Sequence, residues 1–253
     1  MSRTRFAPAP TGNLHLGHVV NAIHVWESGA EVVLRIEDHD RQRSRTEYEE
    51  TIREDLAWLG FVAHIDAGRQ SDRGGDYDSA LDRLRAHGLV YACACTRSAA
   101  AGRENRYPGT CANKGVPEPG HGLRVRLARS VEPFVDRVHG AQEQIPSEQC
   151  GDLLVRDRLG NWTYQFCAVV DDMNQGITLV IRGDDLLPST GRQIQLARML
   201  GRAAPLAFMH HALLMKAPTR KLSKSDGATG IRELRAAGWT REQVIYRARA
   251  MTS

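Results

Sequence analysis

The N-terminal stretch of residues 3–36, RTRFAPAPTGNLHLGHVVNAIHVWESGAEVVLRI, decides the fold class. Residues 3–7 form a short run that leads into a turn rich in proline and glycine, which is typical of a strand that ends at a loop. Apolar residues then recur at helical spacing over residues 16–26, and Gly29 follows where such a helix would end. Residues 32–36 form a compact apolar run, which is typical of a strand buried in a parallel sheet. Together these elements predict a βαβ unit of a Rossmann-like α/β domain.

The composition is that of a globular protein. The 253 residues include 34 Lys and Arg against 30 Asp and Glu, with a net charge of +4, 42% hydrophobic and 25% charged residues. These values exclude disordered, collagen-like and coiled-coil chains. No apolar run approaches the ~18 residues that cross a bilayer, and the N-terminus carries Arg3 and Arg5 in place of an apolar signal segment. We therefore expect a cytoplasmic protein with no membrane partner. The mild basic excess permits a polyanionic partner without establishing one.

The pattern along the chain predicts a catalytic domain interrupted by an insert. Residues 1–90 are expected to form its first half, residues 91–148 an insert with a cysteine cluster and a Gly/Pro-rich loop, and residues 149–253 its second half. Hydrophobic periodicity predicts further helices at 46–59, 77–87, 162–170, 191–200, 231–237 and 241–251, and strands at 123–127 and 176–181.

Residues 8–18, PAPTGNLHLGH, lie between the first predicted strand and helix. Open α/β sheets bind ligands at such a turn, and the N-terminal amides of the following helix favour a phosphate. His15 and His18 add hydrogen-bond donors, and Gly17 lets a ligand approach the backbone closely. Alone, this pattern is common in surface loops.

A second motif, Lys221-Leu222-Ser223-Lys224-Ser225, lies near the end of the chain. Taken in order, the two motifs resemble the signature sequences of class I aminoacyl-tRNA synthetases. The resemblance implies that His15, His18, Lys221 and Lys224 take part in catalysis, and that ATP is bound by His15, Gly17, His18 and Lys224 with Mg²⁺ on its phosphates.

Four further segments, at residues 5–12, 35–40, 170–176 and 182–187, resemble the glutamyl branch of that class. A carboxylate side chain is bound well by guanidinium groups and an α-ammonium by a carboxylate. The resemblance implies a glutamate site formed by Arg5, Phe6, Ala7, Pro8, Ala9, Glu37, Tyr164 and Arg182, with Tyr164 expected in a strand-like segment. Family members commonly have serine where this chain has Ala9, and loss of that hydrogen bond is expected to cost about 0.5–1.5 kcal/mol of binding.

Three of the five cysteines are clustered in the predicted insert. Cys93 and Cys95 are one residue apart and Cys111 follows, and an odd cysteine count without an export signal argues against disulfides. From the residues alone, a three-cysteine metal site and a set of buried thiols are equally supported. The resemblance implies a structural Zn²⁺ held by Cys93, Cys95, Tyr107 and Cys111. Cys150 and Cys167 are expected to be buried small apolar residues.

Only 28 residues follow Ser225, so no anticodon-binding domain is expected. The predicted fold is thus a Rossmann-like class I synthetase catalytic domain with a zinc-bearing insert and short C-terminal helices, acting as a monomer. The chain resembles a catalytic core without an anticodon-binding domain. This resemblance implies ATP-dependent activation of L-glutamate and its transfer to queuosine in the anticodon loop of tRNA(Asp). Two alternatives are a truncated or non-discriminating glutamyl-tRNA synthetase that charges a 3′ end, and a non-catalytic RNA-binding module. The intact lysine motif argues against the second alternative.

Overall fold

The computed structural model describes residues 2–96, 106–213, 215–217, 220–221 and 230–251. The chain divides into two units, each assembled from separate stretches. The first unit comprises Met1–Asp72, Ile177–Leu187 and Ala207–Ser253, and the second comprises Arg73–Gly176 and Pro188–Leu206. The boundaries expected from the sequence at residues 90 and 148 remain predictions.

The first unit is built on parallel strands. Strands β1 (Arg3–Phe6), β2 (Glu31–Ile36) and β3 (Ile65–Arg69) pair in parallel in this order. A second parallel pair is formed by β9 (Leu179–Gly183) and β10 (Ala207–His211). The βαβ unit and the parallel sheet predicted from residues 3–36 are therefore confirmed.

The two groups of strands meet at β1. The N–H of Thr178, just before β9, donates to the carbonyl of Arg3 at 2.9 Å. This contact places β9 beside β1, so that two strands far apart in the sequence are neighbours in space. A short antiparallel pair, β11 (Met215–Ala217) and β12 (Arg220–Lys221), completes the strands described in this unit.

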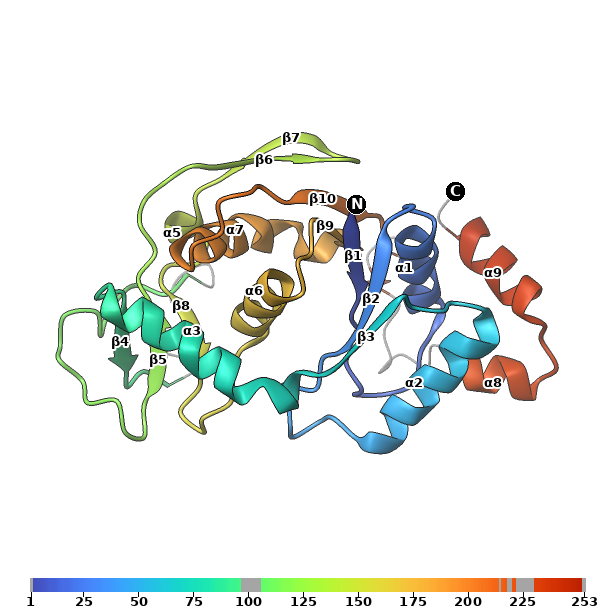
Figure 1. Ribbon diagram of the computed structural model, residues 1–253, viewed down its shortest axis with the longest axis horizontal. Coiled ribbons are helices and arrows are strands. Elements are labelled where there is room, and N and C mark those ends of the chain that lie inside the picture. Colours follow the sequence, from blue (N-terminus) through green and yellow to red (C-terminus); the bar gives the residue numbers. More distant parts are fainter. Residues whose placement is uncertain (1, 97–105, 214, 218–219, 222–229, 252–253) are drawn as a thin grey trace. The chain divides into compact units, whose positions relative to one another are not determined.

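Four helices cover the first unit, namely α1 (Leu16–Trp26), α2 (Thr46–Leu59), α8 (Ile231–Ala236) and α9 (Arg241–Ala250) (Figure 1). The bounds of α1 and α2 are those expected from the sequence. Helix α2 ends there because Gly60 adopts φ 81°, a left-handed conformation that favours glycine. Apolar side chains of α1, α2, α8 and α9 join those of the strands in one core. None of the described helices is long and apolar enough to cross a membrane.

The second unit contains an antiparallel sheet of β4 (Val90–Cys93), β5 (Gly122–Val125) and β8 (Leu153–Arg156). Its core lies between this sheet and the helices α3 (Gly74–Ala86), α6 (Tyr164–Asn174) and α7 (Thr190–Met199). A hairpin of β6 (Glu132–Asp136) and β7 (Gly140–Gln144) and the short helix α5 (Pro146–Gln149) lie in the same unit. The 3₁₀ turns η1 (Gln70–Arg73) and η3 (Asp184–Ser189) lie at the unit boundaries.

Two local expectations were wrong. The strand-like context expected for Tyr164 is incorrect, because this residue is the first of helix α6, following the extended Thr163. Apolar side chains at helical spacing, including Phe166 and Val170, are buried and hold this segment as a helix. The strand expected at 176–181 is shifted to Leu179–Gly183, since Gly176 adopts φ 64° at the end of α6.

Candidate functional site

The predicted ligand-binding turn joins β1 to α1 in the first unit. His15 is the N-cap residue of α1, and its Nδ1 accepts a hydrogen bond from the Gly17 N–H at 3.1 Å. His18 Nδ1 accepts in turn from the His15 N–H at 3.1 Å. The two ring centroids are 3.9 Å apart. The two histidines therefore satisfy backbone donors at the helix start that would otherwise need other partners.

These contacts determine which nitrogen of each imidazole ring carries the proton. Because both Nδ1 atoms accept hydrogen bonds, the proton of each neutral imidazole is on Nε2. Gly17 is required for this arrangement, since a Cβ at this position would lie 2.9 Å from Cε1 of His15. The predicted roles of His15, His18 and Gly17 are thus compatible with a turn that presents Nε2–H groups and backbone amides to an anion.

The turn of the first motif is hydrogen-bonded to residues that follow the second motif in the sequence. Gly230 forms an isolated antiparallel bridge with His15, and the Ile231 N–H donates to the Leu14 carbonyl at 2.8 Å. Lys221 is the last residue of β12, whereas Leu222, Ser223, Lys224 and Ser225 lie outside the described residues. The described residues on either side of this segment, β12 and Gly230, therefore belong to the same unit as the first motif.

Three charged residues of the expected glutamate site lie in the first unit. Arg5 on β1 is buried and donates from Nη1 to the carbonyl of Ile181 at 3.2 Å. Arg182 is buried on β9, one residue beyond this contact, and Glu37 is buried directly after β2. The sheet thus brings two guanidinium groups and a carboxylate from distant parts of the sequence into one unit. This set has the charges that a dicarboxylic amino acid requires.

Two partners of these residues were not predicted from the sequence. Arg35 is fully buried and its Nη2 lies 2.9 Å from Glu37 Oε1. The Nε of Arg182 donates to Nε2 of the buried His210 at 2.9 Å, across the parallel pair β9–β10. Because side chains alternate between the two faces of a strand, residues i and i+2 lie on the same face, and this pattern could have indicated that Arg35 lies beside Glu37. No local signal pointed to His210, since its partner lies on another strand.

The remaining residues of the expected glutamate site have different surroundings. The ring of Phe6 packs in the core against Trp26, with centroids 5.4 Å apart, which leaves its backbone as the part suited to ligand contact. Pro8 is buried, and its carbonyl accepts from the Glu37 N–H at 3.0 Å, so that the 7–9 segment runs beside Glu37. Ala7 and Ala9 are half-buried. Tyr164 belongs to the second unit.

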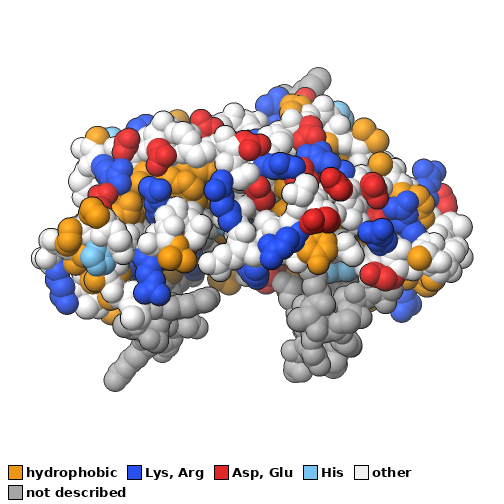
Figure 2. All heavy atoms as spheres, turned by 90° about the horizontal axis from the view of Figure 1, so that it is seen from below, with side chains coloured by type: hydrophobic (Ala, Val, Ile, Leu, Met, Phe, Trp, Pro, Cys, Tyr) orange, Lys and Arg blue, Asp and Glu red, His pale blue; other side chains and the backbone are white. Residues whose placement is uncertain are grey.

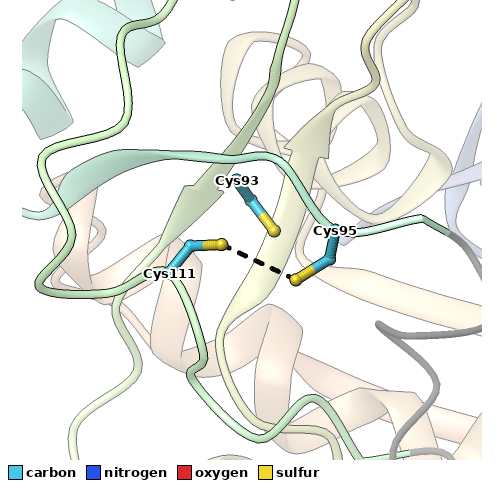
Figure 3. Close-up of side chains that lie close together, drawn as sticks. All are labelled: Cys93, Cys95 and Cys111. Atoms are coloured by element: carbon cyan, nitrogen blue, oxygen red, sulfur yellow. Dashed lines mark hydrogen bonds between the residues drawn. The ribbon is translucent and has the colours of Figure 1, made fainter.

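All four expected metal ligands lie together in the second unit. The sulfur atoms of Cys93, Cys95 and Cys111 lie within 4.8 Å of one another and face a common centre (Figure 3). Cys95 and Cys111 have their Sγ atoms 3.6 Å apart, and the Tyr107 Oη is 3.3 Å from the Cys93 Sγ. In a tetrahedral site with Zn–S bonds of about 2.3 Å, two sulfur ligands are about 3.8 Å apart. The cluster can therefore hold a metal ion of this kind.

The surroundings of the cluster make its thiols unequal. Burial raises the pKa of Cys93, but hydrogen bonding from Tyr107 and the nearby Arg124 guanidinium outweigh burial and lower this pKa to about 7. Burial and the adjacent sulfur atoms raise the pKa of Cys95 to about 11. Arg124 also lies over the Tyr107 ring, 3.6 Å from its centroid. A cysteine with a low pKa supplies the thiolate that binds a metal.

The backbone around Tyr107 explains why glycine occupies position 151. Tyr107 N–H donates to the Cys150 carbonyl at 2.9 Å, and a Cβ on Gly151 would lie 2.1 Å from the Tyr107 carbonyl oxygen. Cys167 is fully buried in the core, as expected, whereas Cys150 is only partly buried and its thiol donates to the Pro146 carbonyl. Neither belongs to the cluster.

The model of the family described as tRNA synthetases class I (E and Q), catalytic domain, matches residues 1–252. The chain belongs to this family. The predicted class I synthetase catalytic fold is therefore confirmed, and the matched range includes both the 8–18 turn and the 221–225 segment.

Relatives of similar length support the same family. The chain is 37% identical over 265 residues to a protein of Rhodobacter capsulatus named glutamyl-Q tRNA(Asp) synthetase, which covers 93% of this chain and 95% of the relative. A Burkholderia cenocepacia protein of the same name is 40% identical over 245 residues, which cover 90% of this chain and 82% of the relative.

A solved synthetase structure has the same fold. A glutamate tRNA ligase of Elizabethkingia meningosepticum, in complex with its amino acid, matches with a TM-score of 0.76 and 29% identity. The match covers 89% of this chain and 52% of the ligase, so the chain corresponds to about half of that protein.

Proposed function

We propose that this chain is an ATP-dependent ligase that activates L-glutamate to glutamyl-adenylate without tRNA and transfers the glutamyl group to queuosine in the anticodon loop of tRNA(Asp). The observation that carries the proposal is the similarity to proteins named glutamyl-Q tRNA(Asp) synthetase, at 37–40% identity over nine-tenths of the chain and 82–95% of their length. The family match and the buried charges of the first unit support the same reaction.

Glutamate is bound by the charged residues of the first unit. The guanidinium groups of Arg5 and Arg182 are suited to its side-chain carboxylate, and Glu37 to its α-ammonium group. Arg35 holds one carboxylate oxygen of Glu37 at 2.9 Å, which leaves the other oxygen for the ammonium. The backbone of residues 6–9 completes the part of the glutamate site that lies in the first unit, and Tyr164 stays a predicted contact. With Ala9 in place of serine, the substrate has one hydroxyl partner fewer.

Activation requires no covalent intermediate on the protein. An α-carboxylate oxygen of glutamate attacks the α-phosphorus of ATP, and pyrophosphate leaves with the electron pair of the broken P–O bond. Negative charge on the phosphoryl oxygens is stabilised by the Nε2–H groups of His15 and His18 and by Lys221 and Lys224, with Mg²⁺ bound to the phosphates. Gly17 keeps the turn open for the nucleotide.

Transfer then joins the glutamyl group to the modified base. A hydroxyl of the queuosine ring attacks the carbonyl carbon of the adenylate, an ester bond forms, and AMP leaves. Single-stranded loop bases are accessible to such a site, because they are not stacked within a duplex.

Cys93, Cys95, Tyr107 and Cys111 hold a structural Zn²⁺ that ties together the residues around the cluster.

The test separates activation from transfer. Glutamate-dependent exchange of labelled pyrophosphate into ATP, measured in the absence of tRNA, is expected to proceed and to require glutamate. Labelled glutamate is then expected on tRNA(Asp) that carries queuosine, and to remain there after the 3′ terminal CCA is removed. The same tRNA with unmodified guanine is expected to accept none. Label that appears only when the 3′ end is intact would establish the second candidate, charging of a tRNA 3′ end.

A further inference from the structure

The C-terminal segment exposes two large aromatic side chains, Trp239 between α8 and α9 and Tyr246 on α9. Trp239 is 36% exposed and Tyr246 is 76% exposed, and they are the aromatic members of the exposed large hydrophobic residues in the described part of the chain. Both line one open pocket of about 530 Å³ on the outer face of α8 and α9, together with Gln243 and Arg247. Two solvent-exposed rings at one pocket form a platform on which flat ligands can stack.

Trp239 also lines a second pocket. It has a volume of about 460 Å³, and Trp58 and Arg232 contribute to its lining along with Glu54, Arg235 and Ala236. The guanidinium of Arg235 lies 5.1 Å from the centroid of the Trp58 ring and donates to Asp55 at 2.8 Å. This ion pair, in which Asp55 is buried and Arg235 is partly exposed, connects α8 to α2.

The helix pair is strongly basic. Residues 231–250 contain five arginines and two glutamates, and one of these, Glu242, is paired with Arg241 at 2.5 Å. Arg232 and Arg247 form no salt bridge with any described residue. Figure 2 draws one face of the molecule, on which charges of both signs are interspersed. Unpaired arginines beside exposed rings favour a polyanion with flat bases as the ligand.

This basic and aromatic surface is joined to the reaction site through the start of α8. The Ile231 N–H, the first of α8, donates to the carbonyl of Leu14 in the turn of the first motif. A polymer bound along α8 and α9 is therefore held by the same unit that carries the two histidines.

We propose that the outer face of α8 and α9 binds single-stranded nucleotides of the tRNA substrate. In this interaction bases stack on Trp239 and Tyr246, while Arg232 and Arg247 bind phosphates. The inference rests on the proposed function and adds to it the residues that hold the RNA outside the reaction site. Its chemistry is sequence-tolerant, since every base has a face that can stack.

The test measures tRNA binding and activation separately in the full-length protein. Tyr246→Ala and Trp239→Ala are each expected to raise the Kd for tRNA(Asp) at least about fivefold. Arg247→Ala is expected to weaken binding and to reduce the slope of log Kd against log salt by about one. In all three variants the tRNA-independent pyrophosphate exchange is expected to stay at the level of the unsubstituted protein.

Controls make the result specific. Tyr246→Phe keeps the ring and should retain the original Kd, and Val62→Ala removes an equally exposed apolar side chain of the same unit without effect. Tyr246→Ala removes a side chain that lies mostly in solvent, so the fold is expected to persist. Unchanged Kd and salt slope in all the variants would overturn the inference. Absence of pyrophosphate exchange in the unsubstituted protein would instead overturn the proposed function.

Discussion

The Nδ1 atom of His18 accepts a hydrogen bond from the backbone N–H of His15 at 3.1 Å. This contact couples the start of helix α1 to the orientation of both imidazole rings. A change that moves one ring is therefore expected to move the other, and both residues are only partly buried. A change at this turn therefore affects both the cap of α1 and the position of the two rings.

Gly17→Ala is expected to abolish most activation while leaving the fold intact. Alanine favours a helix over glycine by about 1 kcal/mol, which offsets the loss of the His15 cap, so the melting temperature should change little. The new Cβ would lie 2.9 Å from the His15 ring, which must move away from its hydrogen bond. Pyrophosphate exchange is expected to fall at least about tenfold. Gly75→Ala is the matched control, since a Cβ there meets nothing within 4 Å, and its exchange rate should be unchanged.

Lys224→Ala is expected to reduce the rate of adenylate formation by roughly 10² to 10³, with a much smaller change in glutamate affinity. A cation that acts on developing phosphoryl charge stabilises the transition state more than the ground state. Single-turnover rates and equilibrium glutamate binding provide the comparison. Lys114→Ala, at an exposed lysine of the second unit, serves as the control. Equal losses in rate and affinity would rule out this role for Lys224.

Cys111→Ser is expected to lower the zinc content from about one atom per chain to well below that value. The serine hydroxyl is a poor replacement for one of three converging sulfur ligands. Cys150→Ser, outside the cluster, should keep its zinc. Metal analysis after dialysis distinguishes the two variants. A Cys111→Ser protein with full zinc content would contradict the assignment.

The stability of the first unit is expected to decrease as the pH falls below about 6.5. His24 and His211 stack with centroids 4.7 Å apart, and burial lowers the pKa of each below its ordinary value of 6.5. The unfolded chain therefore binds more protons than the folded chain in this range, and acid favours unfolding.

The measurement is the melting temperature between pH 7.5 and 5.5. His211→Gln removes one of the two groups and should show a smaller loss on the acid side than the unsubstituted protein. An identical acid-side slope for both proteins would show that this pair does not account for the pH dependence.

Local features of the fold could be predicted from the sequence because their signals are local. The bounds of α1 and α2 follow from helical spacing and from glycine at the end of α2. The β6–β7 hairpin was not anticipated, since its segments are short and mostly polar, with little alternation of apolar residues.

Interactions between strands were harder to anticipate. The hydrogen bond from Arg182 to His210 depends on the register of β9 against β10, which no local pattern specifies. The convergence of Cys93, Cys95 and Cys111 was suggested by spacing, but the position of Arg124 over Tyr107 required the fold of the antiparallel sheet. Lys224 lies outside the described residues, and the catalytic roles predicted for Lys221 and Lys224 both stay predictions.

The assembly of the first unit from three separate stretches has a consequence for biosynthesis. Arg5 reaches the carbonyl of Ile181, 176 positions later in the chain. At about 5–20 residues per second, a ribosome needs roughly 10–35 s to make the intervening residues. Throughout that interval β1 lacks the neighbour that β9 later supplies, and Arg5 lacks its carbonyl partner. The nascent chain therefore passes through a long period with an open sheet edge, when binding by a chaperone would protect it from aggregation.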